Sequence, residues 1–195
     1  MPVITKRLLV FTLIATIPLS VSTLLAEQTN PVHAHIGHVM DGFRSTPDGQ
    51  GLLPTAIAEA KIAAQHAALV AGSGDNLDAM KRHAGHVLHA VDPSELSNGP
   101  GLGFGVKPAA VGASRHIRMA ADSEGASGNV TTHTQHVETS ANNTVERADE
   151  LIALAKAIQE ATTVASAATA ATAAVFTSPT ALPVGSVSPL SLIHI

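Results

Sequence analysis

The chain of 195 residues contains no cysteine, tryptophan or tyrosine, and only four phenylalanines. Without cysteine it has no disulfide framework, no thiolate zinc site, no iron–sulfur cluster, no c-type haem attached through cysteine and no cysteine nucleophile. The low aromatic content of 2% disfavours an aromatic-rich β-sandwich. Alanine dominates the apolar residues instead, which favours closely packed helices.

Charged residues are also scarce. They make up 13% of the chain, and the formal net charge of −4 gives no basic surface of the kind that binds nucleic acid. Apolar residues make up 45%, which excludes a disordered polar chain and is sufficient for one folded domain. No Glu-x-x-His, His-Glu-x-x-His or Gly-x-Ser-x-Gly motif occurs, and no nucleophile has an assignable base, so we do not expect an enzyme.

The N-terminal segment has the pattern of a secretory signal. Residues 1–26 combine two basic residues, an apolar run over 8–19 and small residues before a cleavage position at Ala26. We therefore predict a periplasmic or secreted protein. The alternative is an uncleaved anchor, which is the only contact with a membrane that we expect.

The C-terminal segment also differs in composition from the centre. Residues 161–189 are rich in Ala, Thr, Ser and Pro, and we interpret them as a low-complexity tail. Residues 190–195 read Leu-Ser-Leu-Ile-His-Ile, which is what the transposon end of a common sequencing adapter encodes, so we interpret them as an artefact. The folded domain is then expected over residues 27–160.

The central domain carries five helical patterns and no clear alternating strand. We expect helices over Pro31–Phe43, Leu53–Ala71, Leu77–Val91, Pro108–Ser123 and Asn129–Ala161. The Gly-rich segment 97–105 has no strand before it and no Gly-Lys-Ser/Thr after it, which favours a linker over a phosphate loop. This order predicts an all-α protein, an antiparallel helical bundle of four to five helices built from repeated helical hairpins.

The histidines recur in a repeated motif. The sequence His-x-x-His-Val occurs three times, at residues 35–39, 83–87 and 133–137. In the last two copies a further histidine lies 17 residues upstream, so that one set maps onto the other at a constant offset of 50 residues. The two sets are His66, His83 and His86, and His116, His133 and His136.

Each set spans a Gly/Ser turn between two predicted helices. Residues equidistant from such a turn lie level in an antiparallel pair, so His66 is expected beside His83, and His116 beside His133. The last histidine of each set follows three residues later on the same side of its helix. Neutral imidazoles suit Cu(II), Ni(II) and Zn(II), and the sequence therefore predicts one metal site in each hairpin.

The first predicted helix offers further candidate ligands. His33, His35 and His38 crowd this short segment, and counting across the loops places His38 near the level of His89. We therefore include His35, His38 and His89 among the expected metal ligands. The segment also resembles the His-x-His-x-Asp-His motif of metallo-β-lactamases, but Gly37 replaces the aspartate and no β-structure is predicted around it.

Two stretches carry a resemblance to a known group of proteins. Ala63-Ala-Gln-His66-Ala and Lys81-Arg-His83-Ala-Gly-His86-Val-Leu-His89-Ala, downstream of a signal segment, are similar to small His-rich metal-binding proteins of the bacterial periplasm. Those proteins are four-helix bundles with regularly spaced histidines. The resemblance covers residues 31–91 and, less closely, 111–138. It implies binding or buffering of copper, nickel and related ions.

Two other functions stay open at this point. Facing histidines such as His66 and His83 are also typical of a b-type cytochrome, in which haem lies between helices. The Ala-lined interior is small for haem, which makes this the second interpretation. The third is a ligand-free structural or stress-protective helical protein. The oligomeric state is not predicted by the sequence.

Overall fold

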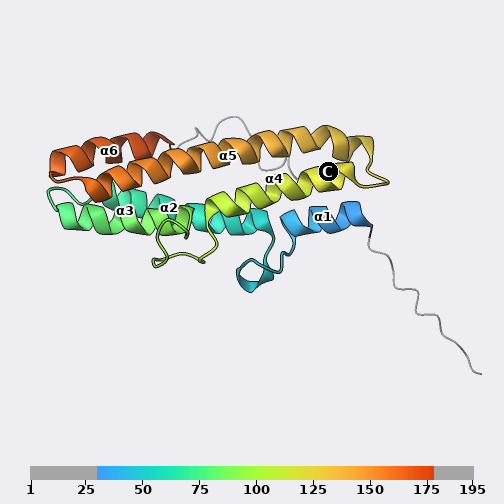
Figure 1. Cartoon of the computed structure of the whole chain (residues 1–195), viewed down its shortest axis with the longest axis horizontal. Coiled ribbons are helices and arrows are strands. Elements are labelled where there is room, and N and C mark those ends of the chain that lie inside the picture. The colour runs from blue at the N-terminus through green and yellow to red at the C-terminus, as the bar shows by residue number, and fades with distance from the viewer. Residues whose placement is uncertain (1–29, 178–195) are drawn as a thin grey trace, which may run out of the picture.

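The computed structural model describes residues 30–177, which form six α-helices, one short 3-10 turn and no strand (Figure 1). The helices are α1 (Pro31–Met40), α2 (Leu52–Ala71), α3 (Leu77–Val91), α4 (Val106–Asp122), α5 (Gly128–Glu160) and α6 (Val164–Thr177), with the 3-10 turn η1 (Pro47–Gly49) between α1 and α2. The prediction of an all-α protein is confirmed, with one helix more than expected. The predicted signal segment and residues 190–195 lie outside the described residues.

Side-chain caps explain why several helices begin where they do. The Asn30 side chain accepts a hydrogen bond from the backbone N–H of Val32, and Pro31 occupies the first helical position of α1. Asn76 caps α3 in the same way, and Ser127 caps α5. Each cap provides an acceptor for a backbone N–H that has no partner within its own helix.

The helices lie side by side in an elongated arrangement (Figure 1). α5 and α6 run along one side, with α1 to α4 along the other. α5 packs on both α4 and α3, α2 packs on α3, and α1 packs on α4. The short helix α1 therefore lies next to a helix that follows it by more than sixty residues in the chain. No described helix is both long and apolar enough to cross a membrane.

Mainly aliphatic side chains form two hydrophobic clusters within residues 30–177. The larger cluster lies where α2, α3, α5 and α6 meet, and alanine contributes many of its buried side chains. Because alanine side chains are short, neighbouring helices can approach closely there. The smaller cluster consists of Val39, Leu52 and Ala113, with three partly buried neighbours, and it joins α1, α2 and α4.

The segment that we expected as a low-complexity tail contributes a helix. Residues 164–177 form α6, and its Ala167 and Ala171 are buried in the larger cluster. These two residues lie one helical turn apart on the same face, while the hydroxyl of Thr163 accepts a hydrogen bond from the N–H of Ser166 at the start of the helix. Alanine has the highest intrinsic helix propensity, so the same composition that suggested low complexity also supports a helix.

A buried carboxylate holds the Gly-rich linker before α4. Glu59 of α2 is fully buried, and its carboxylate oxygens accept hydrogen bonds from the backbone N–H groups of Leu102, Phe104 and Gly105 at 2.9–3.1 Å. A side chain on Gly101 would place its Cβ 2.8 Å from the same carboxylate. Gly101 thus allows close packing against α2, and the hydrogen bonds of Glu59 fix the residue at which α4 begins.

Candidate metal centres

The first cluster joins α2 to α3. His66 projects from α2, and His83 and His86 project from α3, where they lie three residues apart. The Nδ1 atom of His66 lies 3.2 Å from that of His83 and 3.3 Å from that of His86. All three side chains are half-buried. The structure thus brings together the three residues that the first hairpin was expected to combine.

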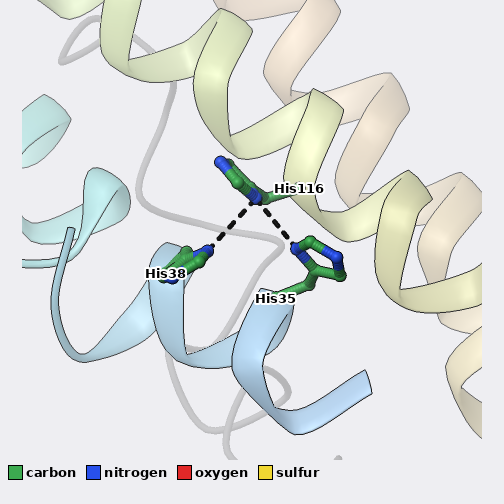
Figure 2. Close-up of side chains that lie close together, drawn as sticks. All are labelled: His35, His38 and His116. Atoms are coloured by element: carbon green, nitrogen blue, oxygen red, sulfur yellow. Dashed lines mark hydrogen bonds between the residues drawn. The ribbon is translucent and has the colours of Figure 1, made fainter. Parts of the chain in front are cut away.

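The second cluster joins α1 to α4 (Figure 2). His35 and His38 project from α1 toward His116 of α4. The Nδ1 atom of His116 lies 3.1 Å from that of His35 and 3.4 Å from that of His38. This grouping corrects the sequence-based one, in which His116 was expected beside His133 and His136.

The orientation of α5 explains this correction. Its Thr134 and Glu138 face α4: the Thr134 hydroxyl donates to the Ile117 carbonyl at 3.4 Å, and Glu138 forms an ion pair with Arg118 at 2.6 Å. Because successive residues of a helix are rotated by about 100°, His133 turns away from the face that carries Thr134. We expected His133 and His116 at the same level along the helix pair, but the face that α5 turns toward α4 carries Thr134 and Glu138 instead of His133.

The two clusters are nearly identical in geometry. In the first cluster, the ring centroid of His66 lies 5.4 Å from that of His83 and 4.6 Å from that of His86, and the rings of His83 and His86 are 5.6 Å apart. In the second, the corresponding distances are 5.3 Å, 4.7 Å and 5.8 Å. Each site therefore consists of a His-x-x-His pair on one helix and a single histidine on its neighbour. We call them the α2–α3 triad (His66, His83, His86) and the α1–α4 triad (His35, His38, His116).

His89, which was expected near His38, has a different role in the structure. It is 6% exposed, and its Nδ1–H donates a hydrogen bond to the Leu96 carbonyl at 2.8 Å. A Cβ on Gly99 would lie 2.7 Å from the Cβ of His89, so the Gly-rich linker packs directly against this residue. His89 therefore belongs to neither triad and anchors the linker instead.

The convergence of three Nδ1 atoms is poorly suited to hydrogen bonding alone. Each neutral imidazole nitrogen either donates one proton or offers one lone pair, yet the central Nδ1 of each triad faces two others at hydrogen-bond distance. A single cation accepts all three lone pairs at once. A tetrahedral ion with nitrogen ligands at about 2.0–2.1 Å separates those nitrogens by about 3.3–3.4 Å. The distances from the central Nδ1 of each triad to the other two, 3.1–3.4 Å, are close to this value.

The electrostatic environment favours the neutral, metal-binding form of the central histidines. Burial lowers the pKa of His66, and the imidazoles of His86 and His83 lower it further. Burial also lowers the pKa of His116, as do His38 and His35. His86 has a pKa lowered by burial first and then by His83 and Arg82. A lowered pKa keeps the ring deprotonated at a pH where an isolated histidine is partly charged.

Glu59 is a buried residue that the sequence analysis did not single out. It lies among Leu52, Thr55 and Ala63, which share one buried face of α2 at helical spacing. A carboxylate on an otherwise uncharged face was the available signal, because a buried charge needs several hydrogen-bond partners. Glu59 affects the α1–α4 triad indirectly, since it fixes the start of the helix that carries His116.

The interior offers little space for a larger ligand. The two best-formed cavities among the described residues hold about 10 Å³ each, and their linings are mainly aliphatic and contain no histidine. Pockets for organic ligands usually hold roughly 300–1,000 Å³. Neither of these two cavities therefore offers a porphyrin a place beside a triad.

The fold and the sites together define an all-helical protein with two clusters of three histidines that could each hold a metal ion. No protein-family model matches the chain, and the comparisons found no match among curated proteins or solved structures.

Proposed function

We propose that the protein binds divalent transition metal ions, one at each triad, and serves as a metal-binding or metal-buffering protein of the periplasm or the secreted fraction. The observation that carries the proposal is the convergence of three Nδ1 atoms at two separate places with nearly the same geometry. The proposal includes cleavage of residues 1–26 as a signal and an antiparallel helical bundle as the scaffold. It also rests on the resemblance to His-rich periplasmic metal-binding proteins.

Among the candidate ions, the geometry favours Zn(II) over Cu(II) and Ni(II). Zn(II) takes tetrahedral sets of nitrogen ligands, whereas Cu(II) and Ni(II) prefer square-planar or tetragonal sets. In a square-planar set, adjacent nitrogens at about 2.0–2.1 Å from the ion lie about 2.9 Å apart. The distances of 3.1–3.4 Å from the central Nδ1 of each triad to the other two support the tetrahedral arrangement, with a fourth position left for water or another donor.

Calorimetric titration of the purified, metal-free full chain with Zn(II), Cu(II) or Ni(II) tests the proposal. We expect Zn(II) to bind at both triads, which together account for two ions per chain. A His33→Ala variant provides the matched control, because His33 is an exposed histidine of α1 outside both triads. Binding weaker than about millimolar for all three ions would contradict the proposal. A Soret absorption band in the protein as isolated would instead support haem binding.

A further inference from the structure

The third His-x-x-His motif has nearly the same pair geometry as the two motifs that belong to triads. The rings of His133 and His136 lie 5.5 Å apart at an interplanar angle of 62°. The corresponding pairs in the triads lie 5.8 Å apart at 73° and 5.6 Å apart at 79°. The α5 pair is therefore arranged as the two-ligand half of a site of the same kind.

Within the described residues, this pair lacks the single histidine from a neighbouring helix that completes each triad. The nearest helix, α4, directs His116 toward α1 instead (Figure 2). His136 is exposed and His133 is half-buried, so the pair lies at the surface of α5. A further ligand can therefore reach it from outside the chain.

The surrounding surface is compatible with close approach of another helix. Around the pair, α5 presents short or neutral exposed side chains, namely Thr132, Gln135, Thr139 and Ser140. The only formally charged residue between positions 129 and 145 is Glu138, which is paired with Arg118. No lysine or arginine of this segment therefore repels an incoming cation.

We propose that His133 and His136 form a third metal site, which the same pair from a second copy of this chain completes around one shared ion. This inference rests on the proposed function for the choice of ion, Zn(II). Two imidazoles fill only half of a tetrahedral set, whereas two copies related by a two-fold axis supply four. The shared cation also offsets part of the repulsion between two chains that each carry a formal charge of −4.

The test measures mass and bound zinc together. The purified full chain is examined by size-exclusion chromatography with light scattering, with and without Zn(II), and bound zinc is determined by elemental analysis. We expect zinc to double the mass and to bind at about 2.5 ions per chain, two in the triads and one shared by two copies. The variants His133→Ala and His136→Ala should stay monomeric and bind about two ions per chain. His33→Ala should behave like the unmodified chain.

A variant with both His66→Ala and His116→Ala separates this inference from the proposed function. It lacks the central ligand of each triad, and circular dichroism verifies that it remains helical. We expect it to dimerise with zinc and to bind about half an ion per chain. A chain that binds two ions and stays monomeric would overturn the inference and leave the proposed function intact. Zinc-dependent dimerisation that survives the loss of His133 and His136 would also overturn it.

Discussion

Replacing His116 by alanine removes the histidine that links α4 to the pair on α1. In the structure this Nδ1 atom lies within 3.4 Å of the Nδ1 atoms of both His35 and His38. Without it, an ion at that site keeps two ligands, both on α1. We expect the α1–α4 triad to lose its zinc and the α2–α3 triad to retain its own, because the two triads share no residue.

The magnitude follows from the linkage between binding and folding. An ion that binds only the folded chain, at a free concentration one hundred times its dissociation constant, stabilises the fold by about 2.7 kcal/mol. For a domain of about 150 residues, this corresponds to an increase in Tm of roughly 5–11 °C. Two occupied triads give roughly twice that increase. The His116→Ala variant should therefore show about half of the zinc-dependent increase in Tm seen in the unmodified chain.

Scanning calorimetry with and without zinc, at a protein concentration that keeps the chain monomeric, measures this increase. A double-mutant cycle then identifies which residues act together. Adding His35→Ala to His116→Ala should cause little further loss of zinc-dependent stabilisation, because the first substitution already abolishes zinc binding at that triad. This corresponds to a coupling energy of about 2–3 kcal/mol between the two residues. His133→Ala should combine with His116→Ala additively, within about 0.5 kcal/mol, because the two residues belong to different sites.

Two results would refute this reasoning. Strong coupling between His116 and His133, with none between His116 and His35, would mean that the sequence repeat defines the site and the observed grouping does not. Complete loss of zinc-dependent stabilisation in His116→Ala would mean that the triads are not independent. His66→Ala serves as the reciprocal control and should remove the other half of the increase.

Four further predictions follow from the contacts of the triads and of Glu59. The pKa values of His66, His86 and His116 are lowered in the folded chain, so the metal-free folded chain binds fewer protons than the unfolded chain. The free energy of unfolding should therefore fall as the pH drops below 6.5, the ordinary pKa of histidine. Urea unfolding at pH 8 and at pH 5 measures this change. Zinc-dependent stabilisation should disappear over the same range, since protons compete for the ligand nitrogens. Glu59→Ala should lower the free energy of unfolding by about 4 kcal/mol, because three hydrogen bonds to a carboxylate are lost. Chemical denaturation measures this loss, and an unchanged free energy of unfolding would contradict the prediction. Gly101→Ala should cost about 1–3 kcal/mol in the same assay, because φ is 144° there and the new Cβ would meet the Glu59 carboxylate.

The sequence alone was sufficient to predict the features that depend on local chemistry. Helix periodicity and the turn residues between helices placed five helices close to their observed bounds. The α2–α3 triad was also predictable, because a five-residue connection forces two consecutive helices to pack antiparallel and thereby sets their register. His66 and His83 lie 17 residues apart across that connection, so counting from the turn places them level, and their positions on the two helices also turn them toward each other. His116 and His133 have the same spacing across an equally short connection, but their side chains do not meet.

Only the tertiary structure decided the α1–α4 triad and the roles of Glu59 and His89. His35 and His116 are 81 residues apart, and no short connection sets the register between their helices. Their contact depends on the small cluster of Val39, Leu52 and Ala113, which brings α1 and α4 together. It also depends on helix rotation, because a change of one residue turns a side chain by about 100° and selects a different neighbour. A periodic sequence specifies which residues share a face, whereas the packing of distant helices determines what that face meets.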